Sequence, residues 1–122
     1  MLEFENYETW KARNVKRKAP ENIVKKACMD WLEAHKIIHN RQQSGRLQII
    51  NPHTRKPYWV MLAEEGSGDI VGCTKSGRYF EIECKSEAGK QSSAQKGHQI
   101  RVESSGGIYI LARSTDDLGV LL

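Results

Sequence analysis

The most constraining stretch of this sequence is Tyr79–Lys85, which reads YFEIECK and alternates apolar with charged residues. Side chains of a β-strand point alternately to its two faces, so the pattern predicts a strand with one apolar face. Glu81, Glu83 and Lys85 then share the other face. Such a face is either a solvated surface, on which charge protects an exposed strand, or a metal site with a lysine beside it.

The segments that flank this strand favour the metal site. Upstream, the glycine-rich segment 66–72 brings Asp69 to the start of an apolar strand, and a serine-glycine-arginine tripeptide then predicts a hairpin turn. Asp69 is therefore expected next to Glu83, where both carboxylates can hold one cation. A hard divalent ion such as Mg²⁺ takes carboxylate and carbonyl oxygens and keeps several waters. Asp69, Glu83 and the backbone carbonyl of Cys84 can supply this partial shell. Lys85 is then expected beside the substrate phosphate.

Four blocks of the sequence, taken in order, carry a family resemblance. The blocks are Gly66–Ile70, Phe80–Lys85, Gly89–Gln95 and Gly106–Tyr109. Together they resemble the VRR-NUC domain, a branch of the PD-(D/E)xK nuclease superfamily, and the similarity extends from about Glu21 to near the C-terminus. This coverage is typical of the short stand-alone phage-type members. The family usually has a proline before the aspartate, whereas this chain has Gly68.

The resemblance implies a DNA endonuclease that depends on Mg²⁺ or Mn²⁺ and uses Asp69, Glu83 and Lys85 for catalysis. It also places Glu21 where the family has an acidic residue that reaches the metal, directly or through water. Gln95, in turn, is given a role beside the lysine. The residues alone allow simpler interpretations. Glu21 can complement a helix dipole, and Gln95 can complete a capping box in the helix it begins.

The expected substrate also follows from the resemblance. Stand-alone members of the family are similar to enzymes that resolve four-way (Holliday) DNA junctions as homodimers, so branched DNA and a second copy are the expected partners. The chain has no separate specificity domain, so backbone and shape contacts are expected to dominate over the reading of bases. The alternatives are a nuclease or nickase that acts on flaps or ends, and a binding module without catalysis.

Composition sets wider limits. With 122 residues, a net charge of +4 and 28% charged residues, the chain fits one soluble domain with a mild preference for polyanions. Cys28, Cys73 and Cys84 have no CxxC spacing, which argues against a disulfide framework or a structural zinc site and favours reduced thiols in the cytoplasm. No apolar run approaches the ~20 residues of a membrane span, and no signal-peptide core is apparent.

The chain divides into a charged N-terminal lead-in, 1–19, and a nuclease-like domain, 20–122. The predicted class is α/β, with a restriction-endonuclease-like mixed sheet flanked by helices in the order α-β-β-β-α-β, plus a terminal helix. The expected helices cover 20–35, a segment from Ser92 to about 105, and the residues after 114. The expected strands are 37–43, 46–50, 58–63, 69–73, 79–85 and 108–112, the last of them near the centre of the sheet. The turn-rich segment 51–57, with two prolines, is expected to form a protruding loop between the second and third of them.

Two further expectations concern surfaces. The apolar segments Tyr58–Leu62 and Leu118–Leu122 are candidates for a dimer interface, although each can instead complete its own core. The basic cluster within the first 19 residues can be either a phosphate-binding arm or a solvated lead-in, with Trp10 as a possible anchor. The four histidines lack metal-ligand spacing and are interpreted as bystanders. Lys25 and Lys26 are expected to face water.

Overall fold

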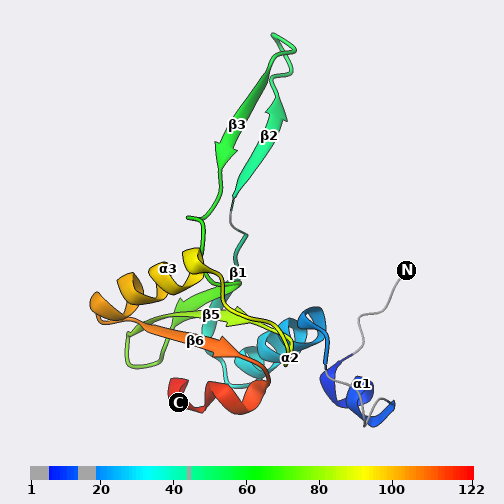
Figure 1. Ribbon diagram of the computed structural model, residues 1–122, viewed down its shortest axis with the longest axis vertical. Helices are drawn as coiled ribbons and strands as arrows, with labels where there is room; N and C mark the ends of the chain where they lie inside the picture. The colour runs from blue at the N-terminus through cyan, green and yellow to red at the C-terminus, as the bar shows by residue number, and fades with distance from the viewer. Residues whose placement is uncertain (1–5, 14–18, 44) are drawn as a thin grey trace.

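The protein consists of helices packed on a central sheet and of one β-hairpin that stands apart from it (Figure 1). The computed structural model describes residues 6–13, 19–43 and 45–122. The elements are α1 (Tyr7–Arg13), α2 (Glu21–Ala34), β1 (Ile38–Arg41), β2 (Arg46–Ile50), β3 (Pro57–Met61), β4 (Ile70–Cys73), β5 (Tyr79–Cys84), α3 (Ser93–Ser104), β6 (Ile108–Ala112) and the 3₁₀ helix η1 (Thr115–Leu121).

The central sheet is four-stranded and mixed, with strand order β1-β4-β5-β6. Neighbours β1–β4 and β4–β5 are antiparallel, whereas β6 runs parallel to β5 after the crossover through α3. The predicted α/β class is therefore confirmed. Without the β2–β3 hairpin, the order α2-β1-β4-β5-α3-β6 is the predicted α-β-β-β-α-β.

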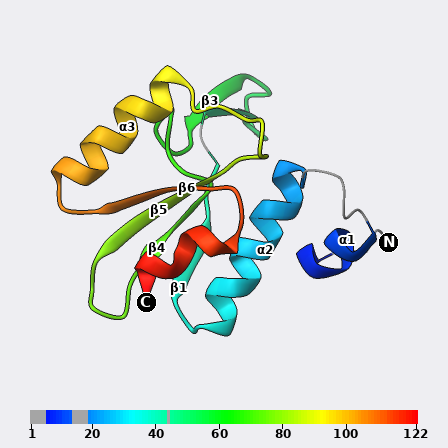
Figure 2. The ribbon, with the colours of Figure 1, turned by 60° about the horizontal axis from the view of Figure 1, so that its bottom comes forward.

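The hydrophobic core lies between the sheet and the pair α2 and η1, while α3 covers the opposite face (Figure 2). Apolar residues of α2 recur at helical spacing and pack on the apolar face of β5, where Phe80, Ile82 and Cys84 are fully buried. Leu118 and Leu121 of η1 join the same cluster. The C-terminal segment thus completes its own core, while Val120 and Leu122 stay exposed.

Several sequence predictions of the fold are corrected. β6 is an edge strand rather than a central one; it is apolar because α3 and η1 cover its two faces. The terminal helix is a 3₁₀ helix, which begins with a capping box between Ser114 and Asp117. Pro20 is the N-cap of α2 rather than its first helical residue. The strands end earlier than expected, since β1 stops at Arg41 and β5 at Cys84.

Part of the N-terminal segment forms a helix that the sequence did not predict. Helix α1 packs on α2, and Trp10 is buried, so this residue anchors the segment as suggested. Lys11 and Arg13 are exposed. The other basic residues of that cluster, at positions 16–18, lie outside the described residues. Within the described ranges, no helix combines the length and apolar character that crossing a membrane requires.

The β2–β3 hairpin forms a two-stranded sheet of its own and projects away from the domain (Figure 1). Its tip is closed by Asn51, whose side-chain oxygen accepts hydrogen bonds from the backbone N–H groups of His53 and Thr54. The backbone N–H of Asn51 donates to the carbonyl of Lys56. The sequence predicted two strands joined by a protruding loop, and this is confirmed.

Candidate metal centre

Three carboxylates converge at the end of β5, close to where α2 begins. One oxygen from each of Glu21, Asp69 and Glu83 lies within 4.8 Å of the other two. The antiparallel register pairs Ile70 with Ile82, so Asp69, one residue earlier, lies across from Glu83 as the hairpin prediction required. Residues from a helix, a loop and a strand, far apart in sequence, thus form one acidic cluster.

Asp69 is held in place by contacts on three sides. The backbone N–H of Cys84 donates to Oδ2 at 2.8 Å, and Nζ of Lys25 lies 3.2 Å from Oδ1. The backbone carbonyl of Asp69 accepts a hydrogen bond from Gln42 at 2.7 Å. Lys25 was expected to face water, and this is wrong for Lys25: its side chain is mostly covered because the carboxylate of Asp69 draws it toward the sheet.

Glu83 is the buried member of the cluster, with 4% of its surface exposed. Its Oε1 accepts a hydrogen bond from Nε2 of Gln95 at 2.7 Å and lies 3.5 Å from Nζ of Lys85. Burial, followed by the charge of Asp69, raises the pKa of Glu83 to about 7, while Lys85 acts in the opposite direction. Without a cation, this carboxyl group therefore holds its proton up to about neutral pH.

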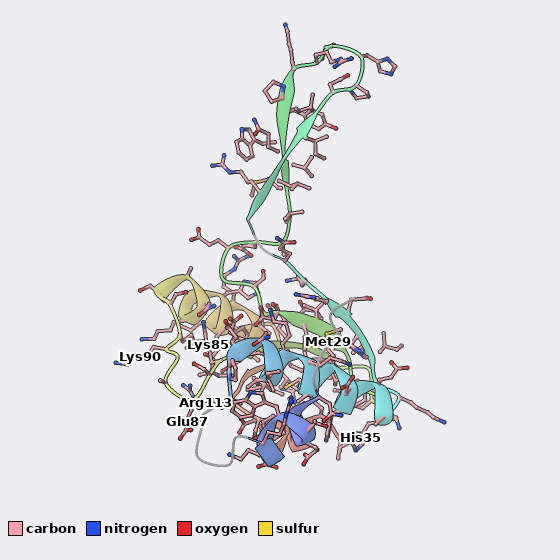
Figure 3. The ribbon with its side chains drawn as sticks, turned by 90° about the vertical axis from the view of Figure 1, so that its right-hand side faces the viewer. Met29, His35, Lys85, Glu87, Lys90 and Arg113 are labelled. Carbon is pink, nitrogen blue, oxygen red and sulfur yellow. The ribbon has the colours of Figure 1, made fainter. Side chains whose placement is uncertain are left out.

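Lys85 lies between two carboxylates, with Nζ 3.5 Å from Glu83 and 4.0 Å from Glu21. Figure 3 places Lys85 near the start of α2, whereas His35 lies near the other end of that helix. The loop that follows is tied down by Arg113, whose Nη1 donates to the carbonyls of Ser86, Glu87 and Gly89 at 2.6, 3.1 and 2.8 Å. Lys85 is thus positioned by charge and by an ordered loop.

Gln95 forms the capping box that the sequence allowed, and its side chain also reaches the acidic cluster. Ser92 and Gln95 form a complete capping box at the start of α3, in which the Gln95 side-chain oxygen accepts from the Ser92 N–H at 2.8 Å. The amide nitrogen of the same side chain donates to Glu83. The two roles are compatible because one amide offers an acceptor and a donor.

Glu21 also keeps both of its interpretations. It lies in the first turn of α2, where a carboxylate complements the helix dipole. Its side chain is 49% exposed, so it sits at the open edge of the cluster rather than over the buried stripe of the helix. Glu21 is therefore the carboxylate most open to solvent, and Glu83 the least.

A second buried carboxylate, Glu81, supports the loop that carries Asp69. Oε1 of Glu81 accepts the backbone N–H of Gly68 at 2.8 Å, and Oε2 lies 2.7 Å from Nε2 of His98. His98 thus contacts a buried carboxylate, although it lies outside the acidic cluster. Proline at position 68 would remove the hydrogen bond to Glu81, and a Cβ there would meet the carbonyl oxygen of Ile82 at 2.9 Å. Glycine at this position thus allows a local interaction that proline could not make.

The backbone and the side chain of Cys84 lie in different surroundings. Its backbone N–H faces Asp69, whereas its thiol is buried, and a hydrogen bond with Cys28, followed by burial, raises the pKa of that thiol. The thiol is therefore neutral and part of the core. The suggested role of the Cys84 carbonyl as a metal ligand stays a prediction.

Several residues of the site escaped the sequence analysis, although spacing could have indicated most of them. Lys25 follows Glu21 by four positions, so the two share a helix face. His98 follows Gln95 by three positions on α3, so the two share a helix face. Arg113 gave no such signal, because its partners are backbone carbonyls.

The donor set suits a hard divalent cation. Carboxylate oxygens are the ligands that Mg²⁺ and Mn²⁺ prefer, and three of them close together repel one another unless a cation compensates. Lys25 and Lys85 supply part of that compensation. The fold and the site define a mixed α/β domain with an acidic centre flanked by lysines. None of the family models, curated proteins or solved structures with which the chain was compared matches it.

Proposed function

We propose that the protein is a DNA endonuclease that depends on Mg²⁺ or Mn²⁺ and hydrolyses phosphodiester bonds. The observation that supports this most is the convergence of Glu21, Asp69 and Glu83 within 4.8 Å, with Nζ of Lys85 3.5 Å from Glu83. Three carboxylates beside a lysine are suited to binding a divalent cation and a phosphate together. The resemblance of the sequence blocks to the VRR-NUC domain agrees with this proposal.

The residues of the site divide the work. A bound Mg²⁺ or Mn²⁺ would supply Lewis acidity and lower the pKa of a coordinated water. Asp69 and Glu83 would hold that ion, and Glu21, the most exposed of the three carboxylates, would add a ligand from the solvent side. Lys85 offers a positive charge where the scissile phosphate gains negative charge in the transition state, and this is where a fixed charge accelerates the reaction most. Gln95 fixes the orientation of Glu83.

The substrate we propose is a four-way junction or a similar branched DNA, cut by two copies of the chain. A junction has two strands to cut at symmetric positions, and a C₂ dimer supplies two centres with the same symmetry.

All three cysteines are free thiols, which supports a cytoplasmic location.

One experiment tests the activity and its substrate class. Labelled four-way junction, flap, nicked duplex and linear duplex are incubated with the protein in Mg²⁺, in Mn²⁺ and in EDTA. We expect cleavage of the junction with either metal and none in EDTA. Asp69→Ala and Glu83→Ala are expected to lose both cleavage and Mn²⁺ binding in calorimetry. Wild-type protein that cuts none of the four substrates with either metal would refute the nuclease.

Assembly is tested separately by sedimentation velocity at micromolar protein, with and without the junction. A stable dimer buries on the order of 1,200–2,000 Å². We expect a dimer on the junction with paired, symmetric cuts. A strict monomer that still makes paired cuts would contradict the two-copy arrangement.

A further inference from the structure

The β2–β3 hairpin, here called the arm (residues 46–61), exposes apolar and aromatic side chains that no part of the described fold covers. Trp59 is 59% exposed and Met61 68%. Leu47, Ile50 and Tyr58 are also exposed. A two-stranded hairpin alone is at best marginally stable in water. An apolar surface on such an element therefore indicates a binding partner outside the domain.

The side chains of the arm lie on two opposite faces, and both are accessible. The register pairs Gln48 with Trp59 and Ile49 with Tyr58, so side chains of alternate residues gather on opposite faces. On one face, the guanidinium of Arg46 lies over the Trp59 ring, 5.3 Å from its centroid. Figure 3 shows side chains projecting from both sides along the full length of the arm. Both faces are thus open to a partner.

Charge identifies the partner. The arm, residues 46–61, contains Arg46, Arg55 and Lys56 and no Asp or Glu, so its formal charge is +3. The whole chain has a net charge of +4, so the arm carries most of it and the remaining residues sum to +1. Arg55 and Lys56 lie at the tip and are exposed. A surface that combines arginine, lysine and exposed aromatic rings is complementary to nucleic acid.

We propose that the arm is a nucleic-acid-binding element that grips the DNA substrate beside the metal centre. This inference rests on the proposed nuclease and specifies how that enzyme holds its substrate. A two-stranded β-ribbon fits the major groove, which is about 12 Å wide. The basic tip contacts backbone phosphates, and Trp59 and Tyr58 offer flat surfaces to bases unpaired at a branch. Pairing with the arm of a second copy would bring two basic segments together, which disfavours that arrangement.

The base of the arm is joined directly to the metal centre. Gln42, just before the arm, donates its backbone N–H to the carbonyl of Asp69 at 2.7 Å. The two chain segments at the base of the arm are hydrogen-bonded to each other. The backbone N–H of Gly45 donates to the carbonyl of Ala63 at 3.3 Å, and the N–H of Ala63 donates to the carbonyl of Gln43. Strands of five residues extend about 17 Å. DNA held along the arm therefore leads toward Asp69.

The test measures binding without cleavage. Fluorescence anisotropy with labelled junction and duplex is carried out in EDTA over a range of salt concentrations. The double variant Arg55→Gln with Lys56→Gln removes the basic tip. The matched control, Lys36→Gln with Lys75→Gln, removes the same charge from two other turns. Each pair includes one residue with positive φ, Arg55 at 62° and Lys36 at 56°, so backbone effects are matched as well.

We expect the tip variant to weaken binding about tenfold or more, and to reduce the slope of log affinity against log salt by about 2. The control pair is expected to change affinity less than twofold. Trp59→Ala is expected to weaken junction binding on the order of tenfold, while Trp59→Phe retains most of it because a ring remains for stacking. Ile100→Ala, at an exposed apolar position of α3, serves as its control.

The outcomes separate this inference from the nuclease itself. If both charge pairs weaken binding equally, or if no arm variant changes it, the arm is not the DNA contact and this proposal is overturned, whether or not the protein cuts. If the arm variants weaken binding but wild-type protein cuts nothing, the nuclease fails and the arm stands. If Trp59→Ala converts a dimer to a monomer in sedimentation and leaves DNA affinity unchanged, the arm binds a second copy and the proposal is overturned.

Discussion

The face of β5 that α3 covers and the β2–β3 arm depart from the usual arrangement of side chains in opposite ways. Folded proteins bury apolar groups and expose charges, so exceptions are informative. On β5, Glu81 and Glu83 are only 2% and 4% exposed. On the arm, Trp59 and Met61 are 59% and 68% exposed. One region hides charge and the other displays apolar surface.

The difference lies in where the partners are. Each buried glutamate has partners inside the fold: Glu83 meets Gln95 and Lys85, and Glu81 meets Gly68 and His98. Buried polar groups that are fully partnered are held rigidly, as a catalytic centre requires. The ring of Trp59 instead lies beside Arg46 of the same arm. The glutamates of β5 are therefore partnered within the fold, which suits the metal centre that we propose, and the exposed side chains of the arm suit the contact with DNA that we propose.

The largest effect is expected at Lys85. Lys85→Ala should lower the cleavage rate by on the order of 10²- to 10³-fold, because the charge acts on the transition state. Mn²⁺ binding and DNA affinity in EDTA should change little. The measurement is single-turnover cleavage, with Lys90→Ala as a control that removes the same charge from the exposed end of the following loop. A Lys85→Ala protein that cuts within tenfold of wild type would place the chemistry elsewhere.

Glu21 gives the next largest effect and tests how far the partnered region extends toward solvent. Glu21→Gln should slow cleavage by about 10- to 100-fold at low Mg²⁺, by analogy with outer ligands of metal sites, and excess Mg²⁺ should restore part of the rate. If Glu21 only complements the helix dipole, the rate stays normal and stability falls by at most ~1 kcal/mol. Glu33→Gln, at an exposed position of the same helix, provides the comparison.

Substitution of Glu83 tests how much stability is lost when this carboxylate is buried in its charged form. Its pKa is raised from 4.5 to about 7 in the folded protein, mainly by burial. The folded state therefore holds a proton that the unfolded state releases, so stability is lost as pH rises from about 4.5 through 7. Glu83→Gln mimics the neutral form and should stabilise the metal-free protein at pH 8 by at most about 3 kcal/mol.

Urea unfolding in EDTA at pH 4.5 and pH 8 measures this difference. The gain from Glu83→Gln should be present at pH 8 and nearly absent at pH 4.5, whereas Glu33→Gln should show little change at either pH. An equal gain at both values would mean that the pKa of Glu83 is the same in the folded and unfolded states, because its neighbours offset the cost of burying its charge. Burying the charge of Glu83 on β5 would then cost the protein no stability.

The sequence predicted the helices and strands of the core better than the contacts that the charged side chains make between them. Alternation in Tyr79–Lys85 and helical spacing after Pro20 are local patterns, so they identified β5 and α2 correctly. The convergence of Asp69 with Glu83 followed from one hairpin turn. The contacts of Lys25 and His98 depend instead on how α2 and α3 pack on the sheet, which local patterns do not determine.

The arm shows the other limit of the sequence. Its strands and tip were predicted, because prolines and Asn51 mark the turn between two apolar runs. Its separation from the sheet was not, because an apolar strand such as Tyr58–Leu62 reads the same whether it faces a core or solvent. For the same reason β6 was placed at the sheet centre although it lies at the edge. Burial is a property of the tertiary structure that periodicity alone leaves open.

The smallest expected effect concerns stability and is the most direct test of the contrast. Trp59→Ala should change the free energy of global unfolding by less than about 0.5 kcal/mol, because the ring is exposed and packs on no part of the core. Phe80→Ala, at a fully buried position of β5, should cost about 3–5 kcal/mol. Urea unfolding of both variants in the same buffer gives the comparison. A loss above about 1.5 kcal/mol for Trp59→Ala would show that the arm folds as part of the core, and its exposed surface would then need an explanation other than binding.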